Sequence, residues 1–287
     1  MASRGRHLEP GASGRIAVGR GMRVWYRVDG DGDDVVLVPT CGNDADFAGL
    51  AAPGRKLVFY DVRGRGRSDA VADPRKAGFD RQVTDVGAVR DALGIERCSI
   101  VGWSYHAGVV AHHALARPGT VTQLVLAAAI APRSGTSTRP GREPDPSDLA
   151  VLDQLQASGL PKSDPAAWCA AWRSVYTRLL LGDPDAFERM APVCDLRNER
   201  PDHVARAMVG MFMSLGRYEW RPTLAALDVA TLLVHGDEDS EPVDSAFEWA
   251  TALPDAQVLV VDGAGPFPWV ERPERFFGAV NRFLAVS

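Results

Sequence analysis

Short apolar runs alternate with helical repeats along most of the chain. Continuous apolar stretches predict buried strands, and apolar residues recurring every three or four positions predict amphipathic helices. The predicted strands cover residues 16–18, 22–28, 35–38, 56–60, 98–101, 122–128, 231–234 and 257–261. The predicted helices cover residues 79–94, 105–115, 245–253 and 273–284. Strands that alternate with helices in this way predict an α/β fold, a mainly parallel sheet flanked by helices.

The pattern changes between residues 133 and 227. A linker rich in Pro, Ser and Arg (133–148) leads to amphipathic helical segments, which are broken at Gly159-Leu160-Pro161 and at later Gly-Asp-Pro and Glu-Arg-Pro turns. We therefore expect a core formed by residues 15–132 and 228–287, with a helical lid inserted at 133–227. The polar, glycine-rich residues 1–14 are expected to form a flexible tail.

One stretch joins a predicted strand directly to a predicted helix. It reads Gly102-Trp103-Ser104-Tyr105-His106, followed by Ala107 and Gly108. Small residues around a serine at such a turn let strand and helix approach closely, and the serine is left exposed at the carboxyl end of the strand. His106 occupies a position where a small residue is usual, so Ala107 and Gly108 would supply the small side chains one and two positions later.

With this turn, three further motifs make residues 15–285 resemble the α/β-hydrolase superfamily. Residues 60–69 (YDVRGRGRSD) resemble its D-x-R-G-x-G-x-S loop, and residues 235–239 (HGDED) resemble its H-G-x-x-D acid loop. Residues 262–269 (DGAGPFPW) lie where the superfamily has G-A-G-H-F-P-W. The closest resemblance is to the lidded branch of proline-iminopeptidase-like and small-ester or lactone hydrolases.

The resemblance implies residue roles, with one departure. Ser104 would be the nucleophile and Asp239 the acid of a Ser-His-Asp triad, but Pro266 stands where the histidine belongs. The oxyanion hole would consist of the backbone N–H groups of Cys41 and Tyr105, which do not depend on side-chain identity.

The missing base changes the expected chemistry. A serine is a poor nucleophile without a neighbouring base, and loss of the histidine in a serine protease lowers turnover by about 10⁶-fold. His106 is the nearest replacement in sequence, although a side chain at this position usually points away from the serine. We expect structural roles for His112, His113, His203 and His235.

Asp239 would then lack its usual partner. A carboxylate at the edge of a dry pocket has a raised pKa and becomes a candidate acid or base. Apolar stripes in the lid favour an apolar or aromatic substrate. The expected pocket residues are Thr40, Trp103, Trp168, Trp172, Tyr176, Phe212, Trp220 and Phe267. Glu199, Glu219 and Glu241 are alternative ligands for a substrate amine, as the iminopeptidase resemblance implies.

Net charge, cysteine spacing and the lengths of the apolar runs limit which binding partners and which cellular location we expect. With 32 basic and 37 acidic residues, the chain has a formal net charge of −5, which gives no reason to expect nucleic acid or an anionic membrane. The four cysteines lack disulfide-framework or metal-site spacing, so we expect reduced thiols and no metal. No apolar run suits a signal peptide or a membrane span. We expect a cytoplasmic monomer or homodimer that binds a small molecule and needs no cofactor.

Three functions remain open. The first is a cofactor-independent enzyme whose altered triad performs cyclisation, elimination, isomerisation or C–C cleavage, in secondary metabolism. The second is a serine hydrolase of esters, lactones or amino-terminal proline peptides with a relocated base such as His106. The third is a non-catalytic protein that binds a small molecule. Fold cannot separate these functions, because one architecture hosts all three.

Overall fold

A computed structural model describes residues 8–19, 21–135 and 145–285. Its centre is an eight-stranded sheet with the strand order β1-β2-β4-β3-β5-β6-β7-β8. β1 and β2 are antiparallel to their neighbours, and the strands from β4 to β8 run parallel. The strands are β1 (Ser13–Ala17), β2 (Arg23–Asp29), β3 (Asp34–Thr40), β4 (Arg55–Asp61), β5 (Cys98–Trp103), β6 (Val121–Ala127), β7 (Ala230–Gly236) and β8 (Ala256–Val261). The predicted α/β fold is confirmed.

Helices cover both faces of the sheet, as continuous apolar strands require. On one face, α1 (Phe79–Leu93), α2 (Tyr105–Ala116) and α8 (Asp244–Ala252) pack in one buried cluster with the sheet. On the other face, η2 (Asp44–Leu50), α9 (Pro268–Glu271) and α10 (Pro273–Leu284) form a second cluster. The helix α1 ends at Gly94, whose φ of 73° is the left-handed conformation that glycine adopts readily.

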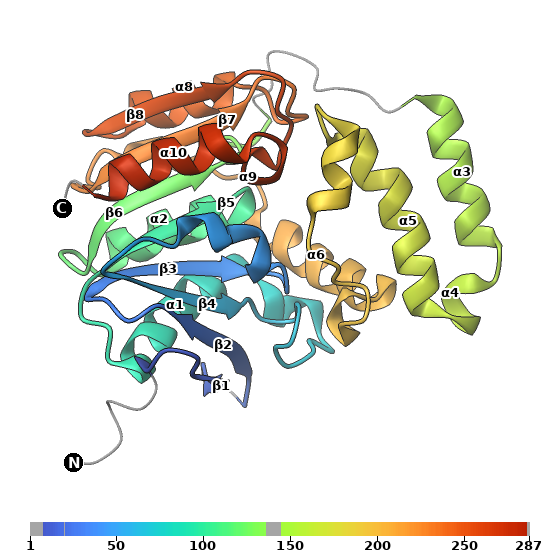
Figure 1. The fold of residues 1–287 in the computed structure, drawn as a ribbon, viewed down its shortest axis with the longest axis horizontal. Helices are drawn as coiled ribbons and strands as arrows, with labels where there is room; N and C mark the ends of the chain where they lie inside the picture. The colour runs from blue at the N-terminus through green and yellow to red at the C-terminus, as the bar shows by residue number, and fades with distance from the viewer. Residues whose placement is uncertain (1–7, 20, 136–144, 286–287) are drawn as a thin grey trace.

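The segment between β6 and β7 is helical in the part that the structure describes. Its elements are α3 (Pro146–Ala157), α4 (Leu160–Ser163), α5 (Pro165–Leu180), η4 (Pro184–Arg189), η5 (Arg197–Glu199), α6 (Pro201–Leu215) and α7 (Arg221–Leu224). Figure 1 shows α3 to α6 beside the core, beyond the arrowhead of β3. We call residues 133–227 the insertion. Its residues 136–144 lie outside the described part, and the same is true of residues 1–7 of the expected tail.

The ordered core begins earlier than the apolar pattern predicts. Strand β1 starts at Ser13, and the Gly11 N–H donates to the carbonyl of Val28 at 2.8 Å. Polar residues at this edge are held by backbone pairing, which leaves no apolar signal in the sequence. Among the described helices, none is long and apolar enough to cross a membrane.

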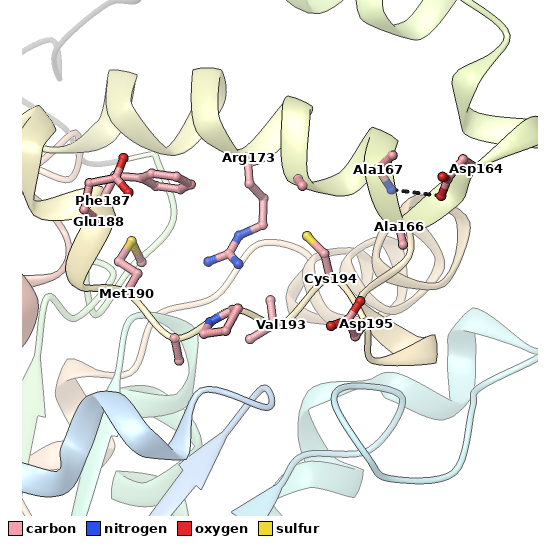
Figure 2. A pocket seen from close by; sticks show the side chains of 13 residues that line it. Asp164, Ala166, Ala167, Arg173, Phe187, Glu188, Met190, Val193, Cys194 and Asp195 are labelled. Carbon is pink, nitrogen blue, oxygen red and sulfur yellow. Dashed lines mark hydrogen bonds between the residues drawn. The ribbon is translucent and has the colours of Figure 1, made fainter.

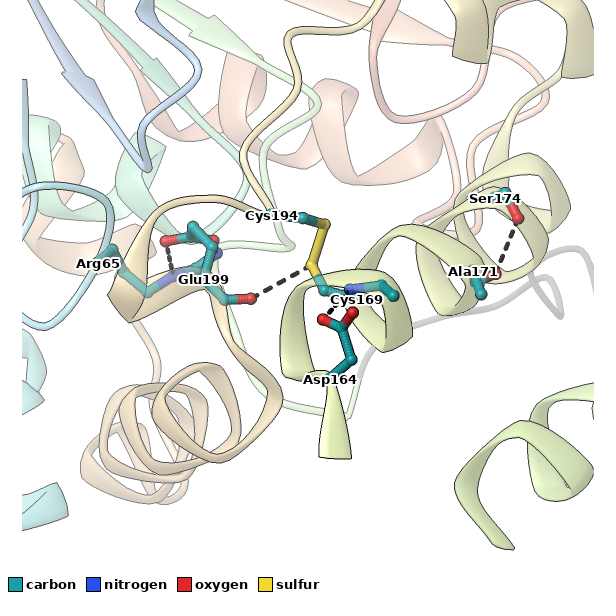
Figure 3. Close-up of a disulfide and its surroundings, with 8 residues drawn as sticks. Arg65, Asp164, Cys169, Ala171, Ser174, Cys194 and Glu199 are labelled. Atoms are coloured by element: carbon teal, nitrogen blue, oxygen red, sulfur yellow. Dashed lines mark hydrogen bonds and ion pairs between the residues drawn. A yellow bond between two sulfur atoms is a disulfide. The ribbon is translucent and has the colours of Figure 1, made fainter. Parts of the chain in front are cut away.

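The expectation of reduced thiols is wrong for two of the four cysteines. Cys169 on α5 and Cys194 form a disulfide, whereas Cys41 and Cys98 are free and buried. Figure 3 shows that this bond joins α5 to the chain that leads into η5. The two cysteines are 25 residues apart, so only the packing of the insertion brings them together.

Candidate active site

Ser104 lies at the turn between β5 and α2, as the motif predicts. Its φ of 50° and ψ of −125° are unusual for a residue other than glycine. Its N–H donates to the carbonyl of Ala127 at 2.9 Å, which ties the turn to β6. A Cβ at Gly102 would meet Val110 Cγ2 at 2.6 Å and Ala107 Cα at 3.1 Å. The strand and the helix therefore approach closely at Gly102, and Ala107 supplies the second small side chain.

His106 points into the core. Its Nε2 lies 3.1 Å from Gln82 Oε1, and the Gln82 amide nitrogen donates to the carbonyl of Ala77. This network leaves the Gln82 oxygen as the acceptor, so His106 Nε2 carries the proton. Burial, with a smaller contribution from the charge of Arg65, lowers the pKa of His106 to about 3. These contacts support a packing role for His106 and make it a weak proton acceptor.

Asp239 follows β7 and is 7% exposed. Its Oδ1 accepts from the Glu241 N–H at 2.9 Å, whereas Oδ2 has no hydrogen-bond partner among the described residues. Burial raises the pKa of Asp239 to about 7, and the nearby charges of Glu241 and Glu271 also raise it. The bond from the Glu241 N–H acts in the opposite direction. A carboxylic acid with this pKa exists in both protonation states near neutral pH, which suits proton transfer.

His235 lies beside Asp239 without forming a full ion pair. Its Nε2 donates to the carbonyl of Glu241 at 2.7 Å and lies 3.5 Å from Asp239 Oδ2. Burial lowers the pKa of His235, so the ring is neutral near pH 7. A neutral ring at that distance does not replace the cation that would normally stabilise an ionised aspartate. His235 braces the acid loop, as the sequence predicts for it.

Pro266 lies in the loop between β8 and α9, directly after Gly265. The carboxylate of Glu271 holds this loop, accepting from the N–H of Gly265 at 2.9 Å and from that of Phe267 at 3.2 Å. Glu271 also accepts from the Asp183 N–H at 3.1 Å, which links the loop to the insertion. Nothing in the sequence marks Glu271 as a site residue, because an isolated glutamate between the motif at 262–269 and the predicted helix at 273–284 carries no recognisable signal.

The two expected oxyanion donors differ in their availability. The Cys41 N–H donates to Asn43 Oδ1 at 3.0 Å, so a substrate oxygen would have to displace this side chain. Tyr105 is the first residue of α2, where a backbone N–H has no acceptor within the helix. The Cys41 thiol is buried, which raises its pKa to about 12, and it is therefore not a nucleophile near neutral pH.

Three of the expected pocket aromatics lie near the elbow. The Trp103 ring centroid is 6.3 Å from that of Phe267, and the Tyr105 centroid is 5.7 Å from that of Phe212 on α6. Trp103 Nε1 is buried and has no partner among the described residues. Phe267 of the core and Phe212 of the insertion therefore contact Trp103 and Tyr105, the two residues that flank Ser104 in the chain.

The other expected pocket residues have structural contacts. Thr40 is fully buried, and its hydroxyl donates to Asp61 Oδ1 at 2.8 Å. Trp220 is buried and stacks on Phe79. Its ring also packs directly on Gly108, where a Cβ would collide with it. Trp168, Trp172 and Tyr176 stack on one another along α5. Their apolar periodicity reflects packing, and periodicity alone does not distinguish packing from ligand contact.

The glutamates considered for amine binding already have partners. Glu199 pairs with Arg65, with Nε to Oε1 at 3.0 Å and Nη2 to Oε2 at 2.6 Å, and Glu199 Oε1 also accepts from the Gly66 N–H at 2.7 Å. Glu219 pairs with Arg221 at 2.6 Å, and Glu241 accepts from the Ala131 N–H at 3.1 Å. These contacts give the three carboxylates structural roles.

The insertion also covers the loop that follows β3 and carries Cys41 and Gly42, which we call the oxyanion loop after the role expected of the Cys41 N–H. A Cβ at Gly42 would meet Leu196 Cδ1 at 2.4 Å, so the absence of a side chain at position 42 lets Leu196 pack directly on this loop. This contact holds the chain around η5 against the loop that follows β3, and the pair between Arg65 and Glu199 holds it against the loop that follows β4.

Sequence relatives include enzymes with different activities. The chain is 27% identical over 291 residues to 2-hydroxymuconate semialdehyde hydrolase of Pseudomonas putida, covering 95% of this chain and 94% of that protein. It is 20% identical to proline iminopeptidase of Heyndrickxia coagulans, covering 81% and 82% of the two chains.

Among solved structures, esterase RhEst1 of Rhodococcus sp. ECU1013 superposes with a TM-score of 0.69 at 25% identity, covering 96% of this chain and 98% of that one. A sequence model described as the alpha/beta hydrolase family matches residues 25–279, which include the elbow, the acid loop and the loop of Pro266. This protein therefore belongs to the alpha/beta hydrolase family.

Proposed function

We propose that this protein is a cofactor-independent enzyme that uses an altered triad for acid/base chemistry on a small, apolar or aromatic organic molecule. The reaction class is cyclisation, elimination, isomerisation or C–C cleavage, and the setting is secondary metabolism. Relatives named as a semialdehyde hydrolase and an esterase support a small organic substrate.

One observation carries the proposal. Pro266, which has no titratable group, stands where the resemblance places the base, while Asp239 has a buried oxygen with no hydrogen-bond partner in the described part of the chain and a pKa of about 7. Removing the imidazole from a triad leaves the aspartate as the group best able to move a proton.

The remaining groups have roles that follow from their contacts. Asp239 would take a proton from a carbon or oxygen of the substrate, or return it. The Tyr105 N–H at the start of α2 and the Ser104 hydroxyl would hold the substrate oxygen on which charge develops. Trp103, Phe212 and Phe267 would contact the apolar body and exclude water, which strengthens these polar interactions.

The retained elbow supports a second candidate, a serine hydrolase with a relocated base. A serine at φ 50° keeps a conformation that costs about 1–3 kcal/mol, which favours a direct role for its hydroxyl. Against this candidate, His106 is bonded to Gln82 and has a pKa of about 3. A protein that only binds a small molecule, without catalysis, is the third candidate.

A serine-directed fluorophosphonate separates the first two candidates. Labelling of the wild-type protein is compared with that of Ser104→Ala, and the labelled residue is identified by peptide mass spectrometry. We expect labelling at the background rate of Ser104→Ala. Rapid labelling confined to Ser104 would overturn the proposal in favour of the serine hydrolase.

A substrate screen separates the first candidate from the third. Once a converted compound is found, Asp239→Asn is expected to lower its turnover by about 10²- to 10⁴-fold, the usual contribution of a general acid or base. Full activity in Asp239→Asn would remove Asp239 from the mechanism. Binding of compounds without any turnover would favour the binding protein.

A further inference from the structure

The insertion contains a cavity of its own. A space of about 630 Å³ lies between α5 and residues 187–195, and all of the residues that line it belong to the insertion. Its volume is within the range of small-molecule sites, about 300–1,000 Å³. Its lining includes none of the side chains that contribute to the chemistry proposed at Ser104 and Asp239.

Arg173 extends from α5 into this cavity. Figure 2 shows its guanidinium between Met190 on one side and Cys194 on the other. The side chain is half-buried, and burial lowers its pKa. Arg173 makes no hydrogen bond or ion pair with any residue that the structure describes, and a guanidinium with five donors in a partly dry site normally has such a partner.

The carboxylates that act on Arg173 through charge are engaged elsewhere. Asp46 and Glu199 both favour the charged form of the guanidinium. The Ala191 N–H donates to Asp46 Oδ1 at 2.7 Å, and both oxygens of Glu199 are held by Arg65. The negative charges of these two acids favour the protonated guanidinium of Arg173, but neither acid accepts a hydrogen bond from it.

The acids that line the cavity are also accounted for. Asp164 accepts from the Ala167 N–H at 3.0 Å and caps α5, and Glu188 pairs with Arg178. Asp195 is exposed to solvent. The surface nearest to Arg173 is instead apolar, and it includes Phe187, Met190 and Val193.

We propose that the cavity of Arg173 is a binding site for a small carboxylate with an apolar body. The planar guanidinium fork matches a carboxylate with two parallel hydrogen bonds, and the surrounding apolar side chains suit a ring or a short hydrocarbon chain. This site goes beyond the proposed function and does not depend on the chemistry at Ser104 or Asp239.

Its position gives the ligand a structural effect. A carboxylate on Arg173 would connect α5 with residues 187–195, and the next residues of that chain lead to Leu196, which packs on Gly42 of the oxyanion loop. Occupancy would therefore stabilise the covered arrangement of the loop.

Benzoate is a suitable probe, with benzamide as its uncharged counterpart. Isothermal titration calorimetry on the full chain is expected to detect benzoate, and benzamide is expected to bind at least about tenfold more weakly, because a charge-assisted pair is lost. Arg173→Gln is expected to weaken benzoate by about tenfold or more. The matched control is Arg206→Gln. Arg206 lies on α6 and forms a loose pair with Asp202, so this variant is expected to bind benzoate as the wild type does.

A second variant fills the cavity without removing the charge. Ala170 is exposed, lines the cavity and lies one turn before Arg173, so Ala170→Trp is expected to fold and to weaken benzoate by a similar factor. The proposal would be overturned if the wild type did not bind benzoate at about 10 mM. It would also be overturned if Ala170→Trp, or a folded Arg173→Gln, bound benzoate as tightly as the wild type does. Circular dichroism checks the fold of each variant.

Discussion

At the residue scale, Ser104 and Pro266 give opposite indications of function. Ser104 has a strained backbone at the turn from strand to helix, whereas Pro266, which has no titratable group, stands where the resemblance places the activating histidine. Strain of this kind persists only where the surrounding structure enforces it, here through the close approach at Gly102 and the bond from Ser104 to Ala127. The combination favours a site that has kept its geometry and changed its chemistry.

Restoring the base tests this interpretation directly. Pro266→His is expected to raise hydrolysis of p-nitrophenyl acetate by at least about 100-fold, because an imidazole would again be available to take the proton of Ser104. Pro266→Ala is the matched control and should show no gain. A gain that persists in Ser104→Ala with Pro266→His would show that the new histidine acts without the serine.

The raised pKa of Asp239 also predicts how the stability of the folded protein depends on pH. Its folded pKa of about 7 exceeds its usual value of 3.8, so the folded state binds more protons than the unfolded state between about pH 4 and pH 7. Stability is therefore lost as the pH rises through this window. Asp239→Asn removes the loss, and we expect it to be more stable than the wild type at pH 8 by about 2–4 kcal/mol, with a smaller difference at pH 4.

Chemical denaturation at pH 4 and pH 8 measures this effect. An advantage of Asp239→Asn that does not grow with pH would mean that the wild-type carboxylate titrates normally. The experiment requires no knowledge of the substrate, so it remains informative if the proposed reaction is wrong.

At the element scale, the disulfide connects α5 to the chain that covers the oxyanion loop. Cys169 Sγ lies 3.5 Å from the carbonyl of Glu199, and the side chain of Glu199 reaches Arg65 of the core (Figure 3). The bond thus belongs to a chain of contacts from α5 to the loop after β4. Its loss would loosen the insertion while the sheet stays intact.

Replacing both cysteines by serine is expected to destabilise the insertion by about 3 kcal/mol, the contribution of a cross-link that closes a loop of this length. Thermal unfolding followed by circular dichroism provides the measurement. Dithiothreitol should shift the wild type toward the double variant and leave the variant itself unchanged. Equal melting temperatures in all four samples would contradict a stabilising role for the bond.

At the scale of the whole molecule, burial is unequal between the sheet and the insertion. Strands β3, β5 and β6 are almost completely buried between two layers of helices, whereas α3 buries only Leu152 and α4 buries no residue. Helices with little buried apolar surface open locally at low free energy.

Hydrogen exchange measured by mass spectrometry should therefore show the central strands protected for much longer than α3 and α4, with α5 intermediate because the disulfide holds it. Adding benzoate should slow exchange in α5 and in residues 187–195 if the cavity of Arg173 binds it. Equal protection of sheet and insertion would contradict this account of local stability.

Most of the fold was predictable from the sequence because its signals are local. Apolar runs and helical spacing placed the central strands and the helices around the sheet, and the elbow, acid-loop and D-x-R-G motifs indicated the family. The proline at position 266, where the resembling motif has histidine, was also visible in the sequence, because a motif relates each position to its neighbours. These features depend on residue order and spacing, which the sequence contains in full.

Other features were decided only by tertiary structure, because they join residues that are distant in the chain. The direction of His106 depends on Gln82 of α1, and the Cys169–Cys194 bond depends on how the insertion packs. Neither contact leaves a local pattern. The same holds for Arg173, which has no partner among the described residues because the nearby carboxylates of Asp46 and Glu199 accept from other donors.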